Sequence, residues 1–180
     1  MASSLILVNG LPGSGKSTLS RRLGQAMQLP GISKDELKEF LADAAGGKVA
    51  GGRLGRIASE TMWQLAAAIQ GTAIVESWWY RPRDLEHARR GIALSGTPGV
   101  VELWCDVDPA TARERYNSRA RHVIHTMDPA TADATWADWE EKGAPLGLGP
   151  TLMVGTAAPV DLHALLDALS AALETLHTAT

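Results

Sequence analysis

The residues best suited to chemistry lie near the start of the chain, where glycines surround a lysine and a serine. Residues 10–17 read Gly-Leu-Pro-Gly-Ser-Gly-Lys-Ser and match the P-loop pattern G-x-x-x-x-G-K-[ST] without a gap. Glycines let backbone N–H groups converge on a phosphate, the lysine adds positive charge at the outer phosphates, and the serine hydroxyl can ligate magnesium. The sequence therefore predicts a site for ATP and Mg²⁺ formed by Gly10, Leu11, Pro12, Gly13, Ser14, Gly15, Lys16, Ser17 and Thr18.

Two carboxylates are placed to act near this loop. Ligands of open parallel sheets bind beyond the carboxyl ends of the strands, and Asp35 and Glu76 each follow a short apolar segment. Transfer of a phosphoryl group to a hydroxyl needs a carboxylate that orients the hydroxyl and accepts its proton, and we assign Asp35 to that role. The alternative interpretation of Asp35 is an exposed acid favoured by the helix dipole. We expect Glu76 to hold Mg²⁺ through water or to contact the acceptor.

An arginine-rich segment follows the fourth apolar run. It contains Arg113, Arg115, Arg119 and Arg121. Residues 120–125 show no helical pattern, so we expect a short lid over approximately residues 119–130. Arginines of a lid can stabilise the charge that develops during phosphoryl transfer, and this is the role expected of Arg119 or Arg121. Arg115 is expected at the adenine, and Arg113 on a solvated helix face. His122 and His125 are expected on the surface of the lid.

Six tryptophans against one phenylalanine and two tyrosines are an unusual aromatic balance. Trp78 and Trp79 directly follow the third apolar run, and flat aromatic walls bind rings and sugars. We therefore expect both to contact the acceptor. Trp136 and Trp139 lie three residues apart on an expected helix, and they either cover the same acceptor or pack that helix onto the domain.

Short apolar runs alternate with helical patterns along the chain, which is typical of a parallel α/β sheet. The expected strands are at about residues 5–9, 31–33, 72–77, 100–105 and 151–154. Helices are expected at about residues 16–28, 33–45, 53–70, from Pro82, from Pro109, at 129–142 and at 159–177. Ser33 and Glu36 form a capping box, and an aspartate precedes the proline at 108–109 and at 128–129.

Length and composition indicate an ordinary globular protein. The 180 residues fit one domain, with 45% hydrophobic and 21% charged residues. A net charge of -3 gives no general attraction to nucleic acid or to anionic membranes. No apolar stretch approaches the roughly 20 residues of a membrane helix, and no basic segment precedes the first apolar run. We therefore expect a cytoplasmic protein. The expected partner is a small-molecule acceptor. Cys105 is the only cysteine and is expected in the core.

Taken together, these segments resemble the small P-loop kinases, a group that includes chloramphenicol phosphotransferase, gluconate kinase, the zeta-toxin kinases and polynucleotide 5′-kinase. The resemblance covers nearly the whole chain and rests on Asn9–Thr18, Ile32–Lys38, Ile74–Ser77 and Arg115–His125. It implies a three-layer α/β fold of the P-loop NTPase type, in which helices flank a five-stranded parallel sheet of order 2-3-1-4-5. It also implies a lid between the fourth and fifth strands, an acceptor-side acid at Asp35, and an adenine-binding turn near Thr156–Pro159.

The sequence favours an ATP-dependent kinase that phosphorylates a hydroxyl of a small molecule, such as an antibiotic, a sugar or a nucleoside-like compound. A P-loop ATPase or nucleotide switch without an acceptor is one alternative. A polynucleotide 5′-kinase is another alternative, because Asp35 and Lys38 have the spacing of the acidic and the basic residue in that group. Lys38 is therefore expected to contact the acceptor. The resemblance is incomplete, since Glu76 stands where the group often has aspartate and Trp78-Trp79 matches no acceptor signature.

Overall fold

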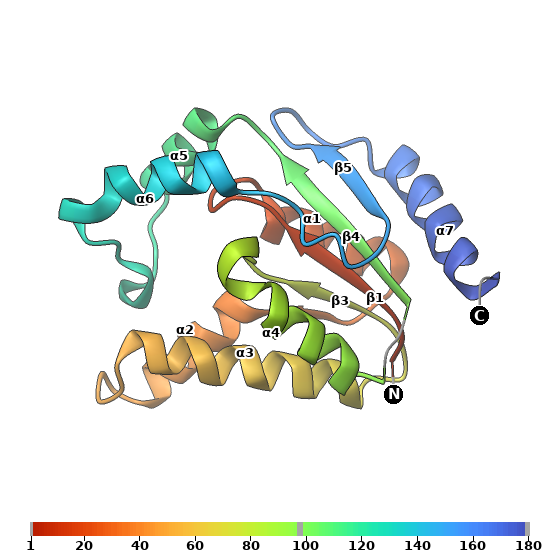
Figure 1. The fold of residues 1–180 in the computed structure, drawn as a ribbon, viewed down its shortest axis with the longest axis horizontal. Helices are drawn as coiled ribbons and strands as arrows, with labels where there is room; N and C mark the ends of the chain where they lie inside the picture. Colours follow the sequence, from red (N-terminus) through yellow and green to blue (C-terminus); the bar gives the residue numbers. More distant parts are fainter. Residues whose placement is uncertain (1, 97–98, 179–180) are drawn as a thin grey trace.

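Five parallel strands form one sheet with the order β2-β3-β1-β4-β5, which confirms the expected topology (Figure 1). The computed structural model describes residues 2–96 and 99–178. The strands are β1 (Ala2–Asn9), β2 (Gly31–Ser33), β3 (Gly71–Glu76), β4 (Gly99–Asp106) and β5 (Thr151–Gly155). Because β1 lies between β3 and β4, the P-loop leaves the sheet at its centre.

Seven α-helices and one 3₁₀ turn are present in the described part of the chain. They are α1 (Lys16–Met27), α2 (Lys34–Ala44), α3 (Gly51–Ala68), α4 (Arg81–Leu94), α5 (Pro109–Ser118), η1 (Val123–His125), α6 (Pro129–Lys142) and α7 (Leu162–Thr178). The two helix starts predicted from Asp-Pro pairs are confirmed. The side chain of Asp108 accepts hydrogen bonds from the first backbone N–H groups of α5, and that of Asp128 accepts one at the start of α6.

Two helix starts differ from the prediction. Helix α7 begins at Leu162 instead of at about residue 159, because the side chain of Asp161 accepts hydrogen bonds from the backbone N–H groups of His163 and Ala164. Helix α3 begins two residues early, so Gly51 and Gly52 form its first turn and not part of the preceding corner.

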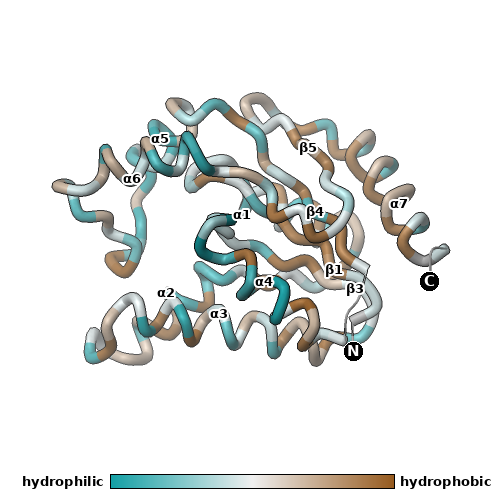
Figure 2. The backbone as a smooth tube through the Cα atoms, viewed as in Figure 1, coloured by the Kyte–Doolittle hydropathy of each residue, from teal (hydrophilic) through white to brown (hydrophobic). Residues whose placement is uncertain are grey.

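The core has two layers, one on each face of the sheet. Along β1, Leu5 and Leu7 point to one face and Ile6 and Val8 to the other, as the pleat of a strand requires. Helices α2, α3 and α4 cover the first face, and α1 and α7 cover the second (Figure 1). Figure 2 shows hydrophobic residues along the strands of the sheet, and the central strands β1, β3 and β4 are buried on both faces.

Cys105 lies in the second of these layers, as expected, and is 2% exposed. Burial raises the pKa of its thiol to about 12. The thiol therefore stays protonated at neutral pH. Within the described residues, no helix is both long enough and apolar enough to cross a membrane.

Candidate active site

A cleft of about 270 Å³ opens at the carboxyl ends of the central strands, between the P-loop, the start of α2 and the segment that joins α5 to α6. It brings together twelve of the residues whose roles the sequence suggested, which are Pro12, Gly13, Gly15, Lys16, Ser17, Asp35, Lys38, Glu76, Trp78, Arg119, Arg121 and Trp139. Asp35 faces this cleft, and its charge acts on both Lys16 and Lys38. The catalytic and acceptor-binding residues expected from the sequence thus share one site, with the exception of Trp79.

The P-loop adopts a backbone that requires glycine. Gly13 has a φ of 84° and Gly15 a φ of 94°, both in the left-handed region. A Cβ atom on Gly13 would collide with the backbone carbonyl oxygen of Ala112 in α5. Helix α1 begins immediately after Gly15, so its first backbone N–H groups are directed at the position of a bound phosphate.

Lys16 and Glu76 form the charged floor of the cleft. The ammonium group of Lys16 is buried, and its Nζ donates a hydrogen bond to the carbonyl oxygen of Leu11 at 3.0 Å. Burial lowers the pKa of Lys16, an effect opposed by the charges of Glu76 and Asp35. Burial likewise raises the pKa of Glu76, opposed by Lys16. Each group therefore makes the buried charge of the other less costly.

The side chains of Ser17 and Glu76 fit a magnesium ion held with the nucleotide. Glu76 is 2% exposed, and its Oε2 has no hydrogen-bond partner among the described residues. A buried carboxylate oxygen without a partner is unusual, and it is the kind of ligand that Mg²⁺ prefers. Nowhere in the described chain do three His, Cys, Asp or Glu side chains gather into a metal site. The remaining ligands would be phosphate oxygens and water, as is common for Mg²⁺.

A second cavity, of about 470 Å³, lies on the far side of the P-loop and suits a nucleoside. Gly13, Gly15 and Thr18 line it together with Arg115 and the turn at residues 156–160. The guanidinium of Arg115 donates hydrogen bonds to the carbonyl oxygens of Thr156 and Ala157, both at 2.9 Å. Arg115 therefore fixes the predicted adenine-binding turn while bordering the cavity.

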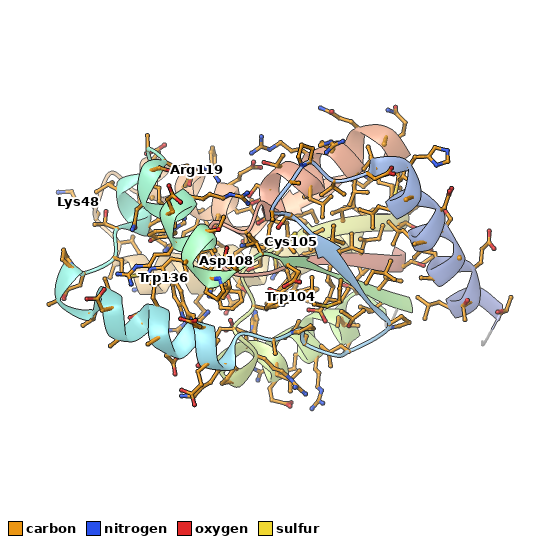
Figure 3. All side chains as sticks on the ribbon, turned by 90° about the horizontal axis from the view of Figure 1, so that it is seen from above. Lys48, Trp104, Cys105, Asp108, Arg119 and Trp136 are labelled. Carbon is orange, nitrogen blue, oxygen red and sulfur yellow. The ribbon has the colours of Figure 1, made fainter. Side chains whose placement is uncertain are left out.

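The expected lid leaves the end of α5 and reaches across to α2 (Figure 1). Arg119 follows the last residue of α5 and borders both the cleft and the nucleoside cavity. Figure 3 shows Arg119 at the same end of the molecule as Asp108 and Trp136. The guanidinium of Arg121 lies over the ring of Tyr116, 4.0 Å from its centroid. Both arginines are thus positioned over the cleft.

Three contacts join the lid to α2. Lys38 Nζ donates to the carbonyl oxygen of Ile124 at 3.2 Å, and His122 Nε2 lies 3.0 Å from Asp43 Oδ1. His125 Nε2 lies 3.1 Å from a carboxylate oxygen of Glu39 but is not aligned for a hydrogen bond. The sequence predicted both histidines on the lid surface. The side chain of His125 instead lines the cleft and is only 10% exposed.

Comparisons with known proteins agree with this geometry. Residues 5–142 match the model of a family described as AAA domain. The chain belongs to this family of small P-loop kinases. Membership implies the use of ATP.

Three individual proteins that are similar to this chain are named as kinases. A shikimate kinase from Corynebacterium glutamicum is 29% identical over 136 residues, which is 72% of this chain and 75% of that protein. The structure of a candidate kinase from Chloroflexus aurantiacus is 31% identical with a TM-score of 0.81, covering 94% of this chain and 98% of that one. A gluconokinase from Sinorhizobium meliloti is 20% identical with a TM-score of 0.64 over 99% and 98%, and shows the shared fold.

The expected contact between Trp79 and the acceptor is wrong. Trp79 is 2% exposed and lies in the core, where its ring stacks on that of Trp63 with centroids 6.0 Å apart. Trp78 does line the cleft, and its ring contacts Trp104 and Trp139. The two neighbouring side chains therefore occupy different environments, Trp78 in the cleft and Trp79 in the core.

A buried polar network that was not expected from the sequence lies behind the cleft. Asn9 and Glu102 are both 0% exposed. The Asn9 amide oxygen accepts from the backbone N–H groups of Gly10 at 2.8 Å and Trp79 at 3.1 Å, and its Nδ2 donates to Glu102 Oε1 at 3.0 Å. Glu102 also accepts from the backbone N–H groups of residues 146 and 147. This network joins the start of the P-loop to the segment after β3. An asparagine just before the glycine and a glutamate inside an apolar strand were its visible signals.

We expect Asn9→Ala to lower the free energy of unfolding by about 2–4 kcal/mol, because it leaves buried partners of the amide unsatisfied. Urea denaturation measures this loss. Asn117→Ala, on the exposed side of α5, is the matched control and should change stability by less than about 0.5 kcal/mol. Equal, small effects of the two variants would show that the network contributes little.

Proposed function

We propose that this chain is an ATP-dependent kinase that transfers the γ-phosphoryl group to a hydroxyl group of a small molecule. The observation that carries the proposal is the shared cleft of Lys16 and Asp35, which lie close enough for their charges to interact. A lysine for the outer phosphates beside an acid for the acceptor hydroxyl is the arrangement that phosphoryl transfer requires.

The proposal gives each of the other residues of the site a separate role. The P-loop backbone and Lys16 bind and orient the phosphates, and Arg115 holds the turn that borders the nucleoside cavity. Asp35 orients the acceptor hydroxyl and accepts its proton. Arg119 and Arg121 stabilise negative charge in the transition state. Mg²⁺ bound at Ser17 and Glu76 would neutralise phosphate charge.

The family and the names of the relatives support a small-molecule acceptor over the two alternatives. The shikimate kinase and gluconokinase relatives are both named as kinases of small molecules. A polynucleotide 5′-kinase would need a basic surface for the backbone of a nucleic acid, whereas this chain has a net charge of -3. A nucleotide switch without an acceptor would not need an acid directed into the cleft.

A screen for transfer tests this proposal. The protein is incubated with Mg-ATP and a panel of sugars, polyols, hydroxy acids, nucleosides, hydroxyl-bearing antibiotics and a 5′-hydroxyl oligonucleotide. Acceptor-dependent release of ADP, with the phosphorylated product found by mass spectrometry, would support it. Phosphorylation of the oligonucleotide alone would favour the polynucleotide kinase. ATP hydrolysis that no compound stimulates would favour the switch.

We expect Lys16→Ala to weaken the binding of ATP by about 10- to 100-fold, because it removes a charge-assisted hydrogen bond to the phosphates. Isothermal titration calorimetry measures the affinity, and circular dichroism verifies that the variant is folded. Lys48→Ala is the control, since Lys48 is exposed and lies at the outer edge of the molecule in Figure 3. Unchanged affinity in a folded Lys16→Ala protein would contradict the assignment.

A further inference from the structure

A cavity of about 740 Å³ adjoins the cleft on the side away from the P-loop. We call it the basic chamber, and its polar lining includes Lys34, Lys38, Arg56, Arg83, Asp84 and His87. Lys34, Lys38 and Arg83 line the cleft as well as the chamber, so the two spaces are neighbours. The volume suits a small molecule, because ligand sites of proteins occupy about 300–1,000 Å³.

The charge of the basic chamber is opposite to that of the whole protein. Four cationic side chains and one carboxylate line it, a net charge of +3, whereas the chain carries -3. Arg83 is neutralised by a two-pronged ion pair with Asp84, at 2.7 and 2.8 Å. In the described part of the chain, neither Lys34 nor Arg56 forms an ion pair. Among the described residues, the chamber thus contains two cations, Lys34 and Arg56, without an ion-pair partner.

The two lysines also repel one another. Lys34 and Lys38 lie four residues apart on α2, a spacing that places like charges on one helix face and destabilises the helix. Burial lowers the pKa of Lys38, and the charge of Lys34 adds to this effect while Asp35 opposes it. A bound anion would relieve this repulsion. The proposed function assigns other residues of the cleft, Lys16, Arg119 and Arg121, to the nucleotide phosphates.

Glycines keep the opposite wall of the chamber open. Gly51, Gly52 and Gly55 of α3 all border it. A Cβ atom on Gly52 would meet nothing within 4 Å, and one on Gly55 would lie 3.8 Å from Cε of Lys38. Because these three positions carry no side chain, this wall of the chamber stays open.

We propose that the acceptor carries an anionic group, a carboxylate or a phosphate, that binds in the basic chamber between Lys34, Lys38 and Arg56 while its reactive hydroxyl lies at Asp35. This inference rests on the proposed kinase function and narrows its substrate to hydroxy acids or phosphorylated alcohols. The chamber selects the substrate through charge, and the cleft carries out the transfer.

Calorimetry on the protein saturated with Mg-ADP tests the inference, because the nucleotide then occupies the P-loop. Two sets of open-chain ligands share a carbon skeleton and differ in charge: D-glucitol, D-gluconate and D-glucitol 6-phosphate, and glycerol, glycerate and glycerol 3-phosphate. At least one anion should bind at least about tenfold more tightly than its neutral counterpart. Within each set, comparison of the carboxylate with the phosphate shows which of the two anionic groups the chamber binds. Equal binding of neutral and anionic members, or no binding of any anion, would overturn the inference.

Three variants locate the site. Lys34→Gln and Arg56→Gln should each weaken the binding of the anion at least about tenfold and reduce its advantage over the neutral compound. Arg53→Gln and Lys48→Gln remove exposed charges that do not line the chamber, and they should leave binding unchanged. Gly52→Leu should block the anion without changing any charge, since leucine favours a helix and its side chain would enter the chamber. Full anion affinity in Lys34→Gln and Arg56→Gln would overturn the assignment.

Transfer measured on the same compounds separates this inference from the proposed function. Phosphorylation of a neutral alcohol but not of its anionic counterpart would support the kinase and overturn the anion site. Binding of an anion that depends on Lys34 and Arg56, without transfer to any compound, would support the anion site and contradict the kinase.

Discussion

Arg121→Gln is expected to lower kcat by about a thousandfold while changing the affinity for ATP less than tenfold. Its guanidinium is held over the ring of Tyr116 and lines the cleft, and its charge contributes to lowering the pKa of Lys16. An arginine that meets the charge of a phosphoryl group in the transition state contributes 10³–10⁵ to kcat. Arg119 also borders the nucleoside cavity, so Arg119→Gln should reduce both kcat and the affinity for ATP.

Steady-state kinetics and calorimetry with ATP measure the two effects separately. Arg113→Gln is the control, because Arg113 lies on α5, pairs with Asp133 and does not line the cleft. Equal losses of kcat and affinity in Arg121→Gln would indicate a contact made already in the ground state. If neither single variant lost activity, the arginines would be an ordinary solvated helix end.

Asp35→Asn is expected to lower the rate of transfer by at least about a hundredfold, because general-base catalysis contributes about 10²–10⁴. Asparagine keeps the shape of the side chain and removes its basicity. Ser33, which accepts a hydrogen bond from the backbone N–H of Glu36, still caps α2 in the variant and fixes the position of residue 35. The binding of ATP and the slow hydrolysis of ATP in the absence of an acceptor should therefore change little.

Initial rates of product formation test this expectation, with ADP release in the absence of an acceptor recorded in parallel. Glu36→Gln provides the control, since Glu36 is the next residue, is exposed and does not line the cleft. Full transfer activity in Asp35→Asn would move the role of the base to Glu76, the other carboxylate of the cleft.

The fold and the backbone of the P-loop could be predicted because their signals are local. A P-loop pattern specifies its own backbone, and an Asp-Pro pair specifies the start of a helix. The position of Trp79 differs from the prediction because a tryptophan suits both a binding wall and a core, and the residue type alone does not distinguish the two.

The basic chamber could not be predicted, because it depends on three elements that meet only in the folded protein. Lys34 and Lys38 come from α2, Arg56 from α3 and Arg83 from α4. In the sequence each is one more charged residue on an amphipathic helix, where charges usually face water. The position of His125 was hidden for the same reason, since its burial results from contact between the lid and α2.

The lid is joined to α2 by contacts of Lys38, Glu39 and Asp43 with residues 122–125. Arg121 lies next to these lid residues, and α2 begins with the turn that carries Asp35. In the proposed kinase, a nucleotide that ordered the lid would, through these contacts, also order the helix that carries Asp35. Such coupling is reciprocal by thermodynamic necessity: the factor by which ATP tightens the binding of the acceptor is the factor by which the acceptor tightens the binding of ATP.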